Sequence, residues 1–187
     1  MYNIDWLKNE FESEDRLKYL FFWGHTPHKE GITTSSCLSQ WWECEFESEG
    51  LKFKSTEHWM MYGKALLFND YDIAEQILKC ESPGEAKALG RKVSNFDNDI
   101  WNQHRMGIVV EGNRLKFSQN EDFKTFLLNT KQRVLVEASP VDEIWGVGLS
   151  RDSDKINNPN SWRGLNLLGF ALMEVRDILK GITNWPE

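Results

Sequence analysis

Two charged residues in one segment form the first pattern that could do chemistry. Glu57 and Lys64 are seven positions apart, so on a helix they share a face, about 10.5 Å apart along its axis. Met60 and Met61 lie between them. A carboxylate or amine that is desolvated at a cleft acquires a shifted pKa, which acid–base chemistry can use. The alternative is a first-turn acid that complements the helix dipole and a solvated lysine.

A second acidic pair flanks a Ser-Pro turn. Glu137 precedes this turn and Asp142 follows it, and Trp145 comes before glycines at positions 146 and 148. Glycines let a backbone approach a ligand closely, and loops on a rigid scaffold often carry site residues. The alternative is a β-turn-β element with a core tryptophan and bulge glycines. The two glycines are not a dinucleotide fingerprint, because the third glycine and the helix that should follow are missing.

The third segment is a polar loop that leads into an apolar helix, which we expect from Arg163 to Lys180, closed by Gly181. Exposed N–H groups in the first turn, together with Arg163, would form a local anion site. Asn166 lies among leucines. It is therefore either a buried hydrogen-bond bridge or a ligand contact.

The remaining histidines, serines and cysteines indicate no second catalytic centre. His58 and His104 have no partner visible in the sequence, so we expect both to be structural. The pair His25 and His28 lacks partners at zinc-ligand spacing, the three cysteines form no CxxC motif, and no GxSxG motif is present. We therefore expect neither a metal nor a cofactor.

The composition limits the classes of partner. The chain has 187 residues, which favours one domain, and a net charge of −7. That acidity excludes global attraction to nucleic acid or anionic lipid, so a nucleotide site must be local. No apolar stretch reaches the ~20 residues that span a bilayer, and no signal peptide is visible, so we expect a reduced, cytoplasmic compartment without membrane contact. Nine tryptophans either fill a bulky core or line a cleft for a flat ligand.

Hydrophobic spacing and turn residues predict the elements that must position these side chains. At the N-terminus we expect a helix that ends near Tyr19, a buried strand over 20–23 and a polar loop over 25–39. Further predicted elements are a hairpin of 42–46 and 51–53 turning at Gly50, helices over 55–68, from Ser82, over 97–117 and over 121–128, and β segments over 134–136 and 144–147. Helices outnumber strands without a regular alternation, so we predict an α+β fold.

An ordered set of motifs runs from about residue 20 to residue 180. The set consists of Phe22-Trp23-Gly24-His25, Leu38-Ser39-Gln40-Trp41-Trp42, the segment 55–65, Gly90-Arg91, Lys116-Phe117, the segment 136–148 and the segment 162–169. In this order it resembles the NADAR family, named for NAD and ADP-ribose, and its YbiA-like N-glycosidases. The resemblance implies a compact, mostly helical single domain over 1–187 with a small β-sheet, in which 1–19 are a helical extension of a 20–180 core.

The same resemblance implies an activity and a site. Family members hydrolyse N-glycosidic bonds: bacterial members cleave early riboflavin-pathway intermediates that carry ribose 5-phosphate, and others remove ADP-ribose from guanine bases. The catalytic residues that it implies are Glu57, Lys64, Asp142 and Trp145. The substrate-binding residues that it implies are Trp23, Gly24, Ser39, Gln40, Trp42, His58, Met61, Glu137, Gly146, Arg163 and Asn166.

One departure from some YbiA-like members concerns the ligand mouth. Where those members have an acid and a short Gly-rich loop after the Trp-Gly pair, this chain has Val147 and a longer insertion within the loop 150–161. We therefore expect the substrate to differ in detail while the reaction type is kept.

Cleavage of a ribosyl C–N bond requires an anion near C1, an acid for the leaving base and a nucleophile. We hypothesise that Asp142 or Glu57 stabilises the oxocarbenium-like centre and orients water. Lys64 would protonate the leaving base or form a transient Schiff base with the opened sugar. Trp145, with Trp23 or Trp42, would stack on the base.

Three alternatives stay open at this point. The chain could bind ADP-ribose or NAD without turnover, or be purely structural. It could also remove ADP-ribose from guanines of nucleic acid through a local basic patch, with Lys52, Lys54, Arg151 or Arg163 as candidates.

Overall fold

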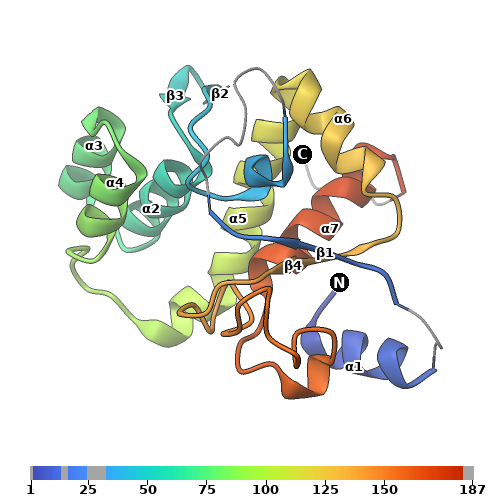
Figure 1. Ribbon diagram of the computed structural model, residues 1–187. Coiled ribbons are helices and arrows are strands. Elements are labelled where there is room, and N and C mark those ends of the chain that lie inside the picture. Colours follow the sequence, from blue (N-terminus) through green and yellow to red (C-terminus); the bar gives the residue numbers. More distant parts are fainter. Residues whose placement is uncertain (1, 14–16, 25–32, 183–187) are drawn as a thin grey trace. The chain divides into compact units, whose positions relative to one another are not determined.

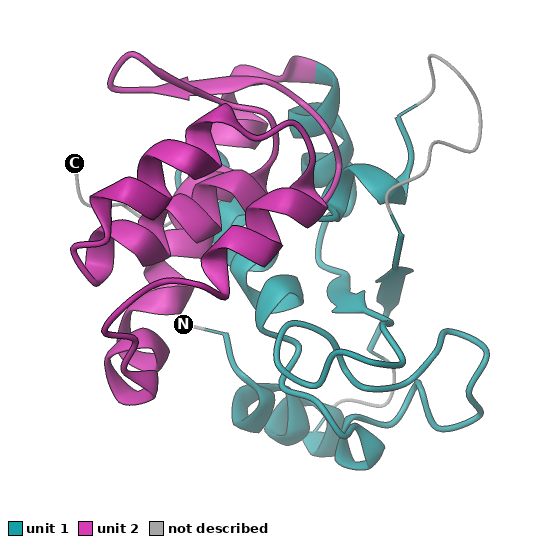
Figure 2. Cartoon of the chain, turned by 90° about the vertical axis from the view of Figure 1, so that its left-hand side faces the viewer, with its two compact units in different colours: residues 1–39, 122–187 teal, residues 40–121 magenta. Residues whose placement is uncertain are grey.

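The structure is a computed structural model that describes residues 2–13, 17–24 and 33–182 (Figure 1). The chain divides into two compact units (Figure 2). Unit 1 comprises residues 1–39 and 122–187, and unit 2 comprises residues 40–121. Each unit consists of helices and one two-stranded sheet, which confirms the α+β class. That residues 1–187 form one domain stays a prediction.

Unit 1 is organised around two parallel strands. Strand β1 (Tyr19–Phe22) pairs with β4 (Val134–Glu137) in a register that sets Phe22 opposite Glu137. Helix α7 (Leu167–Leu179) packs against β4. The first three residues of β4 are buried, as expected of an apolar strand covered on both faces. Because the strands are parallel, the segments that follow Phe22 and Glu137 leave the sheet at the same edge.

Shorter elements complete unit 1. Helix α1 (Ile4–Ser13) packs against the 3₁₀ turn η2 (Pro159–Ser161), and the 3₁₀ turn η1 (Ser35–Leu38) packs against β1. Helix α6 (Glu121–Asn129) precedes β4 and belongs to unit 1 from its second residue on.

Unit 2 combines a hairpin with four helices. Strands β2 (Phe46–Ser48) and β3 (Leu51–Phe53) are antiparallel and are joined by two residues with positive φ, Glu49 at 51° and Gly50 at 78°. Positive φ at both positions is the type I′ geometry that suits a two-residue hairpin. The helices are α2 (Thr56–Leu67), α3 (Tyr71–Lys79), α4 (Pro83–Gly90) and α5 (Asn98–Gln119).

Helix α2 is central to unit 2, because α3, α4 and α5 all pack against it. Trp59 joins α2 to the hairpin: its ring meets Phe53 edge-on at 4.9 Å and its Nε1 donates to the carbonyl of Ile108 at 2.8 Å. Gly112 makes this contact possible, since a Cβ there would overlap the Trp59 ring. Among the described residues, no helix is both long and apolar enough to cross a bilayer.

Several element predictions are wrong at their ends. The N-terminal helix stops at Ser13 instead of near Tyr19, because Tyr19 is already paired with β4. Strand β2 starts at Phe46 instead of residue 42. The last helix starts at Leu167 instead of Arg163, because Asn166 has a positive φ of 55°. Residues 144–146 form a bend and Val147 is irregular, so this segment is not a strand. Sequence analysis also missed α3, η1 and η2.

Candidate functional site

The start of helix α2 carries Glu57 and brings it next to Gln40. The Gln40 carbonyl accepts hydrogen bonds from the Glu57 backbone N–H at 3.0 Å and from Thr56 Oγ1 at 3.2 Å. Its side-chain Nε2 donates to Met60 Sδ at 3.3 Å. Glu57 is only 3% exposed. The predicted acid is thus fixed in a buried first turn, where the helix dipole favours its charge.

Lys64, two turns further along α2, lies among aromatic rings. Its Nζ donates to the Gly90 carbonyl at 2.8 Å and lies 4.2 Å from the ring centroid of Phe96 and 5.8 Å from that of Trp101. Burial lowers the pKa of Lys64 below its ordinary value. Both members of the Glu57–Lys64 pair therefore lie on one helix, as predicted; Glu57 is buried and Lys64 is partly buried.

Met61, about one turn before Lys64 on α2, packs at Gly90. A Cβ at position 90 would overlap the Met61 sulfur, so glycine is required where α4 approaches α2. The Gly90 carbonyl is the acceptor for Lys64. Met61 is buried, and its contact at Gly90 fixes the acceptor that orients the amine.

The contacts of His58 fit the structural role that its lack of a partner in the sequence predicts, and the substrate contact that the resemblance implies stays a prediction. Ser55 caps α2: its Oγ accepts from the His58 N–H at 3.3 Å and lies 2.8 Å from His58 Nδ1. Burial lowers the pKa of His58, so the ring is neutral near pH 7. His104 is exposed on α5. The pair His25 and His28 lies outside the described residues.

In unit 1, Asp142 holds the loop that follows β4. Its Oδ1 accepts from the N–H groups of Ile144 at 2.8 Å and Trp145 at 2.7 Å, and its own N–H donates to Ser139 Oγ at 3.2 Å. These bonds fix the backbone of Trp145, whose side chain is half-buried. Oδ2 of Asp142 is the carboxylate oxygen that none of the described residues engages by a hydrogen bond.

The sequence left two alternatives for Asn166, a buried hydrogen-bond bridge or a ligand contact. In the structure, Asn166 forms the buried bridge. Its Oδ1 accepts from the Glu137 N–H at 3.0 Å, and its Nδ2 donates to the Leu135 carbonyl at 2.9 Å. The residue is 0% exposed. It therefore locks the end of β4, and with it Glu137, to the start of α7.

The anion site predicted at the start of the last helix is not formed. The N–H groups of Leu167 and Leu168 donate to the carbonyls of Ile144 and Trp145 at 3.2 and 3.1 Å, so they are not available to a ligand. The Arg163 guanidinium donates to the carbonyls of Pro140, at 3.3 Å, and Gly148. Arg163 therefore braces the loop after β4.

Glycine is required where this loop meets α7. A Cβ on Gly146 would lie 2.9 Å from the Glu137 carbonyl oxygen, and its own carbonyl accepts from the Asn166 N–H at 3.1 Å. The glycines after Trp145 thus serve close backbone packing. The alternative of a β-turn-β element was wrong, because residues 144–147 form no strand.

The tryptophans divide between core and exposed positions. Trp59 is a core anchor, and Trp162 donates from Nε1 to the Ile156 carbonyl at 2.8 Å, which closes the loop 150–161. Trp23 is 60% exposed directly after β1, and Gly24 beside it has a positive φ of 82°. Trp42 is half-buried in unit 2. Trp23 and Trp145, both in unit 1, keep rings accessible for stacking.

The predicted site residues therefore fall into two sets, one in each unit. Unit 1 holds Trp23, Gly24, Ser39, Glu137, Asp142, Trp145, Gly146, Arg163 and Asn166, and unit 2 holds Gln40, Trp42, Glu57, His58, Met61 and Lys64. Ser39 ends η1, where its N–H donates to the Ser36 carbonyl. The partners that sequence analysis missed are Gly90, Phe96 and Trp101 around Lys64, which no local pattern connects to it.

Neither metal nor thiol chemistry gains support from the described residues. No group of three His, Cys, Asp or Glu side chains within the described ranges could hold a metal ion. Burial raises the pKa of Cys44 and of Cys80, so both are thiols near pH 7.

Comparisons with known proteins agree on one family. The model of the NADAR domain matches residues 21–180. The chain is 43% identical over 166 residues to N-glycosidase R617 of Acanthamoeba polyphaga mimivirus, a match that covers 86% of this chain and 95% of that protein. It is 29% identical over 143 residues to riboflavin biosynthesis protein VVA0006 of Vibrio vulnificus, covering 76% of this chain and 35% of that protein.

A solved structure shares the fold. The NMR structure of the E. coli protein YbiA matches with a TM-score of 0.64 over 91% of this chain and 92% of that chain, at 22% sequence identity. This likeness concerns the fold alone, and it fits the mostly helical α+β architecture.

Proposed function

The chain belongs to the NADAR family and is an N-glycosidase, and we propose that it cleaves the bond between a ribose 5-phosphate and the base of a riboflavin-pathway intermediate. The observation that carries the proposal is the partly buried Lys64 amine on the helix whose first turn holds the buried Glu57. The similarity to a riboflavin biosynthesis protein supports this substrate class.

We assign the chemistry of bond cleavage to Lys64. A lysine that is desolvated among aromatic rings has a larger neutral fraction and is a nucleophile toward C1 of the sugar. The Lys64 nitrogen bonds to C1 while the C1–N bond breaks; the electron pair leaves with the base, which takes up the proton that the attacking amine gives up. Ring opening gives an imine, and water then adds to C1 and returns the free amine and the sugar phosphate.

A carboxylate can stabilise the positive charge that develops at C1 and the ring oxygen. We propose Glu57 for this role, since its burial strengthens its electrostatic effect. Asp142, whose Oδ1 is committed to its own loop, would use Oδ2 to orient water. Trp145 and Trp23 are proposed to stack on the base, each contact contributing about 1–3 kcal/mol.

Removal of ADP-ribose from nucleic acid is the less favoured substrate class. Of the four patch candidates, Lys54 pairs with Glu81 at 2.7 Å and Arg163 donates to carbonyls of its own unit. The net charge of −7 opposes non-specific binding to nucleic acid. Three free cysteines fit a reducing compartment, and we propose a cytoplasmic location.

A panel of substrates tests the proposal. The purified chain is incubated separately with a ribosylamino pyrimidine phosphate, ADP-ribose, NAD and a guanine-ADP-ribosylated oligonucleotide, and released base is measured by mass spectrometry. We expect release from the ribosylamino phosphate to be fastest. Faster release from the oligonucleotide, with a steep salt dependence, would favour the nucleic-acid substrate, and binding without release from any compound would contradict the proposal.

A further inference from the structure

A cluster of basic residues outside the candidate site lines a cleft in unit 1 at the start of its two strands. The cleft has a volume of about 710 Å³ and is lined by Lys18, Lys131, Arg133 and Lys180, with Leu17 and Leu128. No carboxylate among the described residues lines it. We call it the basic cleft.

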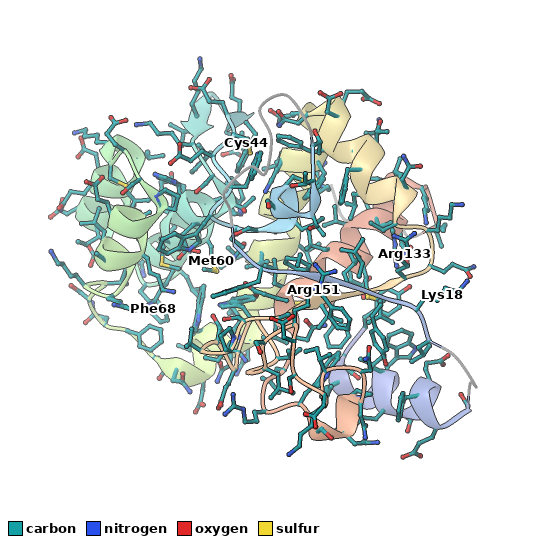
Figure 3. The ribbon with its side chains drawn as sticks, in the orientation of Figure 1. Lys18, Cys44, Met60, Phe68, Arg133 and Arg151 are labelled. Carbon is teal, nitrogen blue, oxygen red and sulfur yellow. The ribbon has the colours of Figure 1, made fainter. Side chains whose placement is uncertain are left out.

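The backbone fixes the four cations relative to one another. Lys18 directly precedes β1, and its carbonyl accepts from the Val134 N–H at 2.9 Å. Lys131 and Arg133 lie on the turn between α6 and β4, which Arg133 closes by donating its N–H to the Thr130 carbonyl at 3.1 Å. Lys180, at the end of α7, donates from Nζ to the Lys131 carbonyl at 3.2 Å. Figure 3 shows Lys18 and Arg133 close to each other at the edge of unit 1.

A buried arginine, Arg176, hydrogen-bonds to the same turn. Arg176 is 2% exposed, and its Nη1 donates to Thr130 Oγ1 at 2.9 Å and to the Arg133 carbonyl at 2.8 Å. Asp177 is the acid that acts on this guanidinium, and its carboxylate accepts from the Tyr2 hydroxyl at 2.6 Å. Arg176 therefore fixes the turn that carries Lys131 and Arg133, while Asp177 offsets part of its charge.

Such a concentration of positive charge is unexpected in a chain with net charge −7. Like charges repel, and an anion with several negative charges relieves this repulsion. The cleft volume lies in the range of about 300–1,000 Å³ that is usual for small-molecule sites. No aromatic ring lines the cleft within the described residues. It therefore lacks the stacking surfaces with which single-stranded nucleic acid is usually bound.

We propose that the basic cleft binds a small anion with two or more linked phosphate groups, free or carried by a nucleotide, through Lys18, Lys131, Arg133 and Lys180. The site is separate from the candidate active-site residues of unit 1. Those residues follow the ends of β1 and β4, whereas the basic cleft lies at their beginnings, four paired residues or roughly 13 Å away along the strands.

Binding of inorganic tripolyphosphate, measured by isothermal titration calorimetry, tests the proposal without using turnover. We expect saturable binding that weakens with added salt. Lys131→Gln and Arg133→Gln should each weaken binding about tenfold or more, because each removes a charge-assisted contact. Lys155→Gln, which removes an exposed lysine elsewhere in unit 1, should leave it unchanged. Lys18→Gln provides a further cleft variant if either of the others does not fold.

The controls separate this site from others. ADP and inorganic phosphate are titrated alongside, and we expect ADP to bind through the same residues and inorganic phosphate to bind far more weakly. Base release should be the same in the cleft variants as in the wild type, so a failure of the proposed glycosidase activity does not affect this test. Equal tripolyphosphate affinity in wild type and folded cleft variants would overturn the proposal, as would cleft-dependent binding of a short oligonucleotide alone.

Discussion

At the residue scale, one backbone carbonyl and two aromatic rings surround the Lys64 amine and set its chemistry. The Gly90 carbonyl accepts from the amine, and the rings of Phe96 and Trp101 replace water around it. Rings of this kind favour the cation, whereas burial favours the neutral amine. Burial lowers the pKa of Lys64 below its ordinary value. An amine that is neutral more often near pH 7 suits Schiff-base formation.

Reductive trapping tests the nucleophile. With borohydride and the ribosylamino phosphate, we expect a covalent sugar adduct on Lys64, located by peptide mass spectrometry. Lys64→Arg should abolish the adduct because a guanidinium does not form an imine. Lys79→Arg, an exposed helix lysine paired with Glu75, serves as the matched control. Turnover by Lys64→Arg at the wild-type rate would show that Lys64 is not the nucleophile.

The pH dependence follows from the same shift. A nucleophilic amine must be neutral, so kcat/KM should rise with pH through the pKa of Lys64. Because that pKa is lowered, the midpoint should lie below the ordinary lysine value of 10.5. The free energy of unfolding should also rise with pH, because burial favours the neutral form of Lys64. The stability that Lys64 contributes is fully present above its ordinary pKa and is lost as pH falls through its pKa in the folded chain. A rate that falls with rising pH across this range would instead indicate that protonated Lys64 is the acid.

Asn166 offers a prediction about stability. Asn166→Ala removes both bonds of the bridge and leaves the Glu137 N–H and the Leu135 carbonyl without this partner. We expect a loss of about 2–4 kcal/mol in the free energy of unfolding, measured with urea. Asn166→Asp keeps the acceptor but places a carboxylate oxygen against the Leu135 carbonyl at a position that is 0% exposed, so it should be at least as destabilising as Asn166→Ala. A loss below about 0.5 kcal/mol in Asn166→Ala would contradict the bridge as a stabilising element.

At the scale of elements, small residues decide how closely helices approach their neighbours. Gly90 admits Met61 where α4 meets α2, and Gly169 admits the Leu135 carbonyl where α7 meets β4. Such contacts fix the position of a helix more tightly than apolar patterning does, because a single Cβ would separate the two backbones. The candidate residues on α2 and after β4 take their positions from these contacts.

Two glycines of α5 form a matched pair. Gly112→Ala should destabilise the chain by about 1–3 kcal/mol, since the added methyl overlaps the Trp59 ring. Gly107→Ala meets nothing within 4 Å and should stabilise it by about 0.5–1 kcal/mol through helix propensity. Thermal unfolding of both variants provides the measurement. Equal effects in the two variants would show that the Trp59 contact does not limit packing.

At the scale of the whole molecule, local signals predicted the elements better than their contacts. The Ser82 capping box, the Asp97 cap and the apolar run of β4 are local, and each starts an element where predicted. The strand predicted over 144–147 is absent because the backbone groups of this segment bind Glu137 and the start of α7, which are distant in sequence. The helix that carries Glu57 and Lys64 was readable from spacing. The rings around Lys64 and the basic cleft were not, because folding alone assembles them.

Base release by one variant pair tests the central claim most directly. The wild type, Glu57→Gln and the exposed control Lys79→Gln are each incubated with a ribosylamino pyrimidine phosphate, and free base is measured over time. We expect base release by the wild type and the control, and a rate about 10²- to 10⁴-fold lower in a Glu57→Gln variant that unfolds like the wild type. Release at the wild-type rate by folded Glu57→Gln, or none by the wild type, would contradict it.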